Sequence, residues 1–126
     1  MSSLVERLID HFLQTGLKDW KFAQETLERG KTDYALFFAH LAVEKLLKAH
    51  VARVRQEMPP RIHNLVKLAE LSQLKDKLPV VSLAELNVYN LEGRYPEMDE
   101  PPPPMEEAAR LFENAEQVIT WLQQKL

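Results

Sequence analysis

Apolar residues recur at three- and four-residue steps over most of this chain, the spacing of helices that bury one face. The first such run keeps one helical phase from residue 3 to about residue 29. Gly16 lies inside this run, where a glycine can bend a helix. Gly30 follows it, in the position where glycine commonly ends a helix. The pattern therefore predicts one long helix that ends at a glycine.

A second long helix is predicted from Asp33 to Gln56. Asp33 or Thr32 can cap its N-terminus, and Pro59-Pro60 prevents it from continuing. The adjacent Phe37 and Phe38 point about 100° apart, so one face cannot bury both, and one of them is expected at a subunit interface. The predicted buried face consists of Tyr34, Phe38, Leu41, Ala42, Leu46, Ala49 and Arg53.

Three further helices are predicted in the second half of the chain. A short one fits Ile62 to Ser72, and the capping-box sequence Ser82-Leu-Ala-Glu85 starts another, which Gly93 ends. Consecutive prolines favour a stiff connector before a long helix that has Pro104 in its first turn and reaches Leu126. No stretch alternates with period two for long enough to form a sheet. The predicted fold class is all-α, an antiparallel up-and-down bundle of about five helices, three long and two short.

Polar residues form a line along the flank of the second helix. His40, Glu44 and Lys48 repeat every four residues and therefore stack on one side, and Arg55 lies about two turns beyond Lys48. Glu44 and Lys48 are either an exposed salt bridge worth about a few tenths of a kcal/mol, or a partly buried pair. If the pair is partly buried, Glu44 can orient His40 or contact the base of a nucleotide. The sequence leaves open whether the line is a pocket or a solvated face.

Length, cysteine content and charge narrow the possible functions. With 126 residues the chain can bury a core as one domain, and its lack of cysteine excludes disulfides, thiolate metal sites and a cysteine nucleophile. It lacks an apolar signal core and any run near the roughly 18 apolar residues of a membrane span, so we expect a cytoplasmic protein without membrane contact. The net charge is −3, yet residues 44–67 carry six basic and two acidic side chains, net +4. That stretch either contacts phosphates or is a solvated helix face.

Four short motifs occur in order along the chain. They are Gly30-Lys-Thr-Asp33-Tyr34, Ala42-Val-Glu44-Lys45-Leu-Leu-Lys48-Ala49, Ile62-His63-Asn64-Leu65 and Leu91-Glu-Gly-Arg94-Tyr95-Pro96. The second is similar to the signature of the HEPN domain, a small helical family. The fourth resembles the Arg-Tyr-Pro turn of single-domain prokaryotic HEPN proteins. The resemblance runs from about Gly16 to the end, so residues 1–126 are interpreted as one HEPN-like domain in which residues 1–15 extend the first helix.

The resemblance has implications that the residue pattern alone does not carry. It implies a bundle that pairs as a homodimer and that is associated with nucleotides or RNA. It also implies a minimal nucleotidyltransferase partner, sometimes in a toxin–antitoxin pair. Many HEPN proteins are metal-independent ribonucleases in which an arginine precedes a histidine by four to six residues. In that chemistry the histidine moves a proton while the arginine holds the phosphate.

This chain departs from the ribonuclease pattern. Seven residues separate Arg55 from His63, and two of them are Pro59 and Pro60, which break the helix needed to hold the pair. No histidine follows Arg94. The candidate catalytic residues are His63, Arg55 and Arg94, and none of them completes the motif. We therefore expect binding without cleavage; the alternatives are a metal-independent endoribonuclease with an altered motif, and a helical dimerisation module without a ligand.

The ligand-binding candidates are Glu44, Lys48, His63, Arg94 and Tyr95. His63 either bonds a backbone group or Glu44, or contacts a ligand. Arg94 and Tyr95 either hold a helix end or offer a phosphate contact beside a stacked base. The four histidines lack carboxylates at zinc spacing and the three glycines form no phosphate-binding loop, so neither a metal nor a cofactor is expected. The prediction is a groove between the middle of the second helix and the Arg-Tyr-Pro corner.

Overall fold

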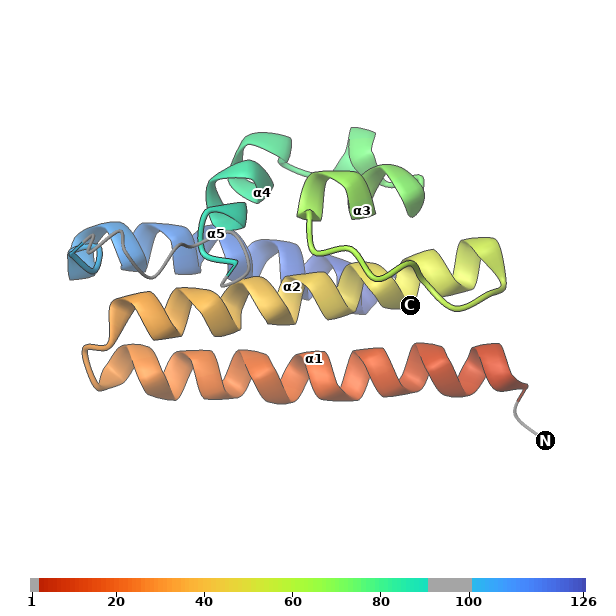
Figure 1. Cartoon of the computed structure of the whole chain (residues 1–126), viewed down its shortest axis with the longest axis horizontal. Coiled ribbons are helices and arrows are strands. Elements are labelled where there is room, and N and C mark those ends of the chain that lie inside the picture. Colours follow the sequence, from red (N-terminus) through yellow and green to blue (C-terminus); the bar gives the residue numbers. More distant parts are fainter. Residues whose placement is uncertain (1–2, 91–100) are drawn as a thin grey trace.

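The computed structural model describes residues 3–90 and 101–126, and these stretches contain only helices and connecting segments (Figure 1). This finding confirms the all-α prediction. The elements in chain order are α1 (Leu4–Glu28), α2 (Thr32–Arg55), α3 (Leu65–Leu71), the short 3-10 helix η1 (Lys75–Lys77), α4 (Val80–Asn87) and α5 (Met105–Gln124).

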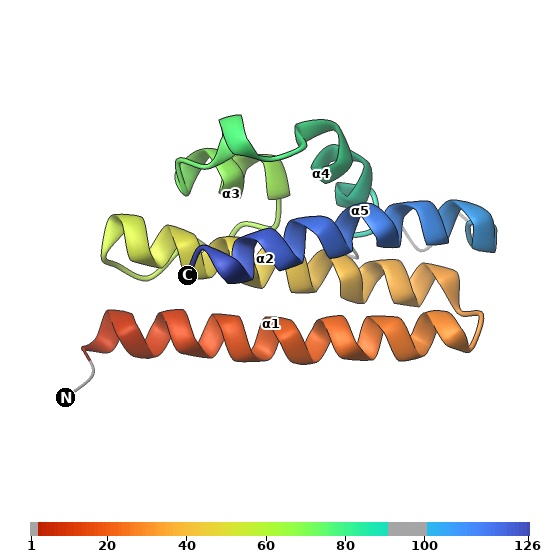
Figure 2. The same ribbon diagram turned by 180° about the vertical axis from the view of Figure 1, so that it is seen from behind.

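Helix α2 lies at the centre of the bundle. It forms an antiparallel hairpin with α1, and α3 and α4 lie on the side of α2 opposite α1 (Figures 1 and 2). Helix α5 runs alongside α2 in the same direction. Three hydrogen bonds show this register, because Thr32 contacts Pro103, His50 contacts Leu122 and Arg53 contacts Lys125, at sequence offsets of 71, 72 and 72 residues. A constant offset means a parallel pair, which the segment containing α3 and α4 makes possible by returning the chain to the starting end of α2.

The long helices begin and end close to the predicted residues, but the cap of α2 differs from the prediction. Its N-cap is Lys31, which makes no side-chain capping bond. The Thr32 hydroxyl instead donates to the carbonyl of Pro103 at 2.6 Å, and Asp33 accepts from the backbone of Tyr34 at 2.9 Å. Thr32 therefore ties the start of α2 to the start of α5. Gly30 has a φ of +77° and ends α1 as expected.

The third predicted helix is shorter than expected because Asn64 caps it. The Asn64 side-chain oxygen accepts from the backbone of Val66 at 3.0 Å and of Lys67 at 3.2 Å. Since the capping residue is only half in the helix, α3 begins at Leu65 rather than at Ile62. This shift leaves His63 in the connecting segment, outside the helix.

The fourth helix is displaced toward the N-terminus. It begins at Val80, directly after its N-cap Pro79, so Ser82 lies inside the helix and the predicted capping box is wrong. It also ends at Asn87, well before Gly93, which lies outside the described residues. The turn η1 between α3 and α4 was not predicted, because three residues are too few for a periodic signal.

Gly16 does not bend α1, which continues through it as one helix. A Cβ atom at this position would lie 3.2 Å from Cβ of Lys45 and 3.3 Å from the carbonyl oxygen of Ala42. The glycine therefore lets the backbones of α1 and α2 approach each other, and its predicted role as a bend is wrong.

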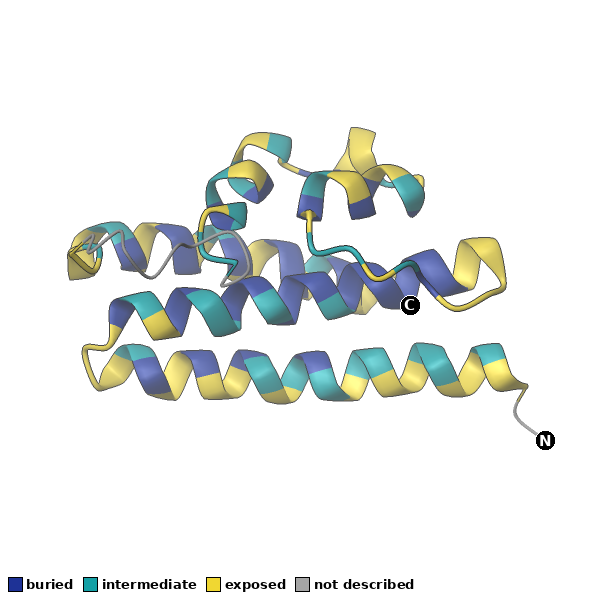
Figure 3. Ribbon diagram, in the orientation of Figure 1, coloured by how far each residue is buried: buried dark blue, intermediate teal, exposed yellow. Residues whose placement is uncertain are grey.

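Burial around α2 extends over most of its circumference, so the prediction of one buried face is wrong (Figure 3). Leu36, Val43 and Leu47 lie off the predicted face and are fully buried, while Tyr34 lies on it and is 58% exposed. The reason is that α2 has neighbours on several sides, so polar positions beside its apolar stripe are also covered. Among these buried polar residues are His40, Glu44 and Lys48.

The two adjacent phenylalanines of α2 are both half-buried. The rings of Phe37 and Phe38 contact each other edge to face, with centroids 5.1 Å apart. Phe38 also packs against Phe22 of α1, with centroids 4.6 Å apart. A role for either phenylalanine in a subunit interface stays a prediction.

Candidate functional site

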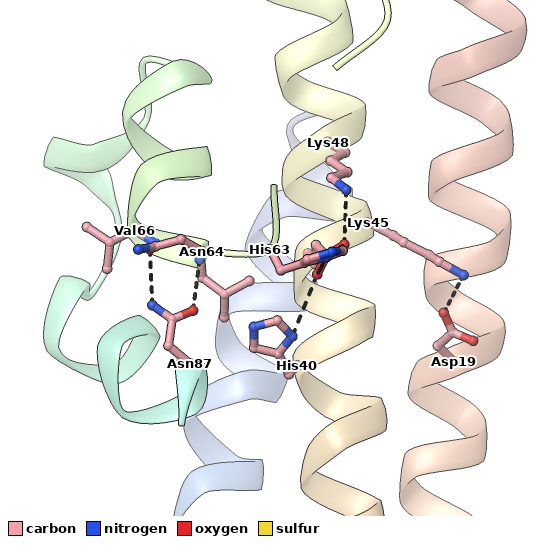
Figure 4. A network of polar contacts seen from close by, with 10 residues as sticks. Asp19, His40, Lys45, Lys48, His63, Asn64, Val66 and Asn87 are labelled. Carbon is pink, nitrogen blue, oxygen red and sulfur yellow. Dashed lines mark hydrogen bonds and ion pairs between the residues drawn. The ribbon is translucent and has the colours of Figure 1, made fainter. Parts of the chain in front are cut away.

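Glu44 of α2 is the buried centre of a polar cluster, which we call the Glu44 cluster and which consists of His40, Glu44, Lys48 and His63. The Lys48 ammonium lies 3.0 Å from one carboxylate oxygen, and Nδ1 of His63 lies 3.1 Å from each of the two oxygens. Nδ1 of His40 lies 3.7 Å from the carboxylate (Figure 4). The Glu44 side chain is only 5% exposed. The predicted line of polar residues is therefore neither a solvated face nor an exposed salt bridge.

One helix and one connecting segment contribute the residues of this cluster, and a second helix supports the segment. His40 and Lys48 lie one turn before and one turn after Glu44 on α2, so the helix itself aligns all three. His63 comes from the segment that precedes α3, and its position is set by its neighbour Asn64, the α3 cap. Asn87 of α4 donates to Asn64 at 3.1 Å (Figure 4). Helix α4 therefore fixes the segment that places His63 beside Glu44.

Neither a role for Asn87 nor the capping role of Asn64 was predicted from the sequence, in which Asn64 was only part of a motif. Asn87 also accepts a hydrogen bond from the backbone of Leu65 at 2.9 Å, so it satisfies a donor in the first turn of α3. The capping role of Asn64 could have been predicted from the sequence, because asparagine directly before an apolar helical run is a preferred N-cap residue. Asn87 gave no such signal, because its role depends on how α4 packs against α3.

The hydrogen bond to Glu44 determines which nitrogen of His63 carries the proton. An ionised carboxylate only accepts hydrogen bonds, so Nδ1–H of His63 donates to Glu44. In the neutral ring Nε2 then carries the lone pair. The His63 side chain is 34% exposed, whereas its carboxylate partner is buried. The structure therefore presents an oriented imidazole at the protein surface, and this confirms the interpretation that His63 bonds Glu44.

Two further histidines are buried and titrate below the ordinary range. Burial lowers the pKa of His40, although the nearby Glu44 acts in the opposite direction. Burial also lowers the pKa of His50, whose Nε2–H donates to the carbonyl of Leu122 at 2.8 Å. Both rings are therefore neutral in the folded protein near pH 7, and His50 joins α2 to α5.

Acid is expected to destabilise the fold through these two histidines. Their pKa is lower in the folded than in the unfolded chain, so the unfolded state binds more protons below the ordinary value of 6.5. Stability is therefore complete above that pH and falls as the pH drops toward the folded-state pKa. We expect the melting temperature to decrease between about pH 7.5 and pH 5.5. His50→Gln should show a smaller decrease, and an equal decrease in the variant would contradict the role given to His50.

The other predicted site residues lie apart from the Glu44 cluster or outside the described residues. Arg55 is exposed at the end of α2, where its Nε lies 3.2 Å from Glu57. Arg55 therefore pairs with Glu57, and a pairing of Arg55 with His63 has no support in this contact. Arg94 and Tyr95 belong to residues 91–100, which the structure does not describe. The groove predicted between Arg94 and the middle of α2 stays a prediction.

Neither a metal-binding group nor a membrane-spanning helix occurs among the described residues. Within residues 3–90 and 101–126, no three His, Cys, Asp or Glu side chains are placed to hold a metal ion. None of the helices in the same stretches combines the length and the apolar character of a membrane span.

The chain matches a known domain family over most of its length. The model of the HEPN domain family matches residues 9–125. This chain belongs to the HEPN family. The HEPN match includes the whole Glu44 cluster and begins at residue 9, within the first half of α1.

A solved structure similar to this HEPN chain is that of TT1696 from Thermus thermophilus. The two chains superpose with a TM-score of 0.73, are 23% identical, and match over 94% of this chain and 98% of the other. At that identity the likeness shows the fold alone. A comparison with curated proteins gives no match.

Proposed function

We propose that this HEPN protein associates with a nucleotide or RNA at the surface around the Glu44 cluster, and that it acts with a minimal nucleotidyltransferase partner. The observation that carries the proposal is the pair of Glu44 and His63, in which a buried carboxylate holds an imidazole that is 34% exposed. A histidine that only filled the core would be covered. The His63 ring is instead held by a buried carboxylate and is partly exposed to solvent.

The chemistry of the pair suits a ribonucleotide. In the neutral ring Nε2 can accept a hydrogen bond from a ribose hydroxyl, and the protonated ring can donate to a phosphate oxygen. Arg61, two residues earlier, is exposed on the same segment, and the net charge of +4 over residues 44–67 favours a polyanion. The buried Lys48 lies 3.0 Å from the same carboxylate, and this contact helps to hold Glu44 in place beside His63.

The binding test uses a fluorescently labelled single-stranded RNA oligonucleotide, with ATP as a competitor. His63→Ala should weaken binding about tenfold, the loss of roughly one charge-assisted hydrogen bond. His11→Ala is the matched control, because His11 is an exposed histidine on α1, away from the cluster. Lys48→Ala and Arg94→Ala should also weaken binding. Equal affinities for the wild type, His63→Ala and Arg94→Ala would overturn the site assignment.

An endoribonuclease is the second candidate function, and the same pair favours it. A carboxylate that fixes the tautomer of a histidine makes the ring a directed general base or acid. The test is incubation with labelled RNA in the presence of a chelator. Cleavage that His63→Ala abolishes and His11→Ala retains would support the ribonuclease. Intact RNA, or cleavage that survives in His63→Ala, would exclude it.

The partner is proposed from family membership. If the gene beside this one encodes a minimal nucleotidyltransferase, the two proteins should copurify when they are expressed together. A toxin–antitoxin relationship would show as arrested growth when one gene is expressed alone and as recovery when both are expressed. Independent elution of the two proteins and unaffected growth would contradict this part of the proposal.

A homodimer is proposed from the family and from exposed aromatic residues on the α1–α2 hairpin. Phe22 is 50% exposed and Tyr34 is 58% exposed, and both border a groove of about 370 Å³. Light scattering should give twice the monomer mass for the wild type and a lower mass for Tyr34→Glu. A monomeric wild type at tens of micromolar (an assay range) would remove the dimer.

A further inference from the structure

A cleft lies at the C-terminal ends of α2 and α5, close to η1. Its volume is about 680 Å³, within the range of small-molecule sites. The side chains that line it include His50, Arg53, Ser72, Lys77, Trp121 and Lys125. No acidic side chain occurs among the described residues of this lining. Three cations and one indole ring therefore face a common space in a protein whose net charge is −3.

Hydrogen bonds between α2 and α5 hold the walls of this cleft in place. Nη1 of Arg53 donates to the carbonyl of Lys125 at 2.9 Å, and His50 donates to the carbonyl of Leu122 at 2.8 Å. One anchored nitrogen fixes the Arg53 guanidinium, which has five N–H donors in all. The positive field of Arg53 also lowers the pKa of His50, after the larger effect of burial. An arginine held in this way is preorganised to bind an anion.

The aromatic wall comes from α5. Trp121 is half-buried, and the ammonium of Lys125 lies 5.7 Å from the centre of its ring. A lysine over an exposed indole is a weak contact, and the flexible lysine stem lets the ammonium move to a stronger anionic partner. An indole face beside several cations has the two features that bind a nucleotide, a stacking surface and phosphate contacts.

Capping of helix C-termini does not account for all three cations. Arg53 belongs to the last turn of α2 and Lys125 is the C-cap residue of α5, and at both positions a basic side chain lies near free carbonyl groups. Lys77 lies at the end of neither helix, because it is an exposed residue of the three-residue turn η1 that lines the same cleft. We propose that this cleft binds a nucleoside polyphosphate, with the base on Trp121 and the phosphates among the three cations. The site is separate from the Glu44 cluster and does not depend on the function proposed for it.

Tryptophan fluorescence tests the proposal directly. The chain has two tryptophans, and Trp20 is buried and stacked on Phe112, so an added ligand should quench mainly Trp121. Titration with ATP should quench the emission and saturate, and Trp121→Phe should remove the saturable signal. Tripolyphosphate, which has no ring, should displace ATP while quenching less by itself. A short RNA that quenches while ATP does not would assign the cleft to RNA ends and overturn the proposal of a free nucleotide.

Two lysines of the same short helix provide a matched pair of variants. Lys77 lines the cleft, whereas Lys75 lies 2.9 Å from Glu70 and does not line it. Lys77→Ala should weaken ATP binding about tenfold, and Lys75→Ala should leave it unchanged. Both residues are exposed, so both variants should fold. His63→Ala should also leave the quenching unchanged, which separates this site from the one above. Equal effects of Lys77→Ala and Lys75→Ala, or no saturable quenching at millimolar ATP, would overturn the proposal.

Discussion

Glu44→Ala is expected to lower the free energy of unfolding by about 3 kcal/mol or more, the usual cost of breaking a buried ion pair from one side. The substitution leaves the Lys48 ammonium, whose side chain is 11% exposed, without the carboxylate that lies 3.0 Å from it. It also removes the group that holds His63. Urea denaturation measures the effect, and in a domain of this size the melting temperature should fall by roughly 10 °C.

Glu116→Ala is the matched control for Glu44→Ala, because Glu116 is an exposed glutamate in the middle of α5. Its removal should change stability little. Equal unfolding curves for the two variants would show that Glu44 does not hold the cluster together.

Gly16→Leu is the second substitution with a large expected effect. A Cβ atom alone would already lie 3.2 Å from Lys45 and 3.3 Å from the backbone oxygen of Ala42, so a leucine side chain can fit only if α1 moves away from α2. Overpacking of this kind costs about 1–3 kcal/mol, and we expect the upper end because one contact is with the backbone. The measurement is again urea denaturation.

Gly16→Ala separates packing from helix propensity. In an open helix position this change would stabilise by up to about 1 kcal/mol. Here the close contacts should cancel that gain, so the variant should be no more stable than the wild type. A clear gain in stability would mean that α1 and α2 are less tightly packed at this point than the structure shows.

The three long helices were predictable because each is long enough to show a helical period, and two of them are followed by a residue that stops a helix. Gly30 follows α1, and Pro59 and Pro60 prevent α2 from continuing. The predicted and observed ends of the long helices therefore differ by at most two residues. The short helices were less predictable because their starts depend on single residues. Asn64 moves the start of α3, and Pro79 is used as a cap where Ser82 was expected.

Features that depend on packing were not readable from the sequence. The parallel course of α2 and α5 follows from how α3 and α4 return the chain, and no periodicity encodes it. Burial of Glu44 and Lys48 also could not be read, because charged residues beside an apolar stripe are usually exposed. The pairing of Glu44 with His63 was among the interpretations considered for His63, but its support by Asn64 and Asn87 requires the packing of α3 on α4.

The cleft at the ends of α2 and α5 was not found from the sequence for the same reason. Arg53 was assigned to the buried face of the second helix, although it is exposed, and Trp121 was not among the predicted site residues. Lys77 lies in a turn that was not predicted. Three residues from three separate elements form one site only after the fold brings them together.

The central claim is that buried Glu44 fixes the orientation of His63 at the surface. Nitrogen-detected NMR of the histidine side chains tests it most directly, at a pH where the rings are neutral. The expected result is that His63 of the wild type carries its proton on Nδ1, and that Glu44→Gln shifts it toward the Nε2–H form. A wild-type His63 protonated on Nε2, or an equilibrium that Glu44→Gln leaves unchanged, would contradict the account.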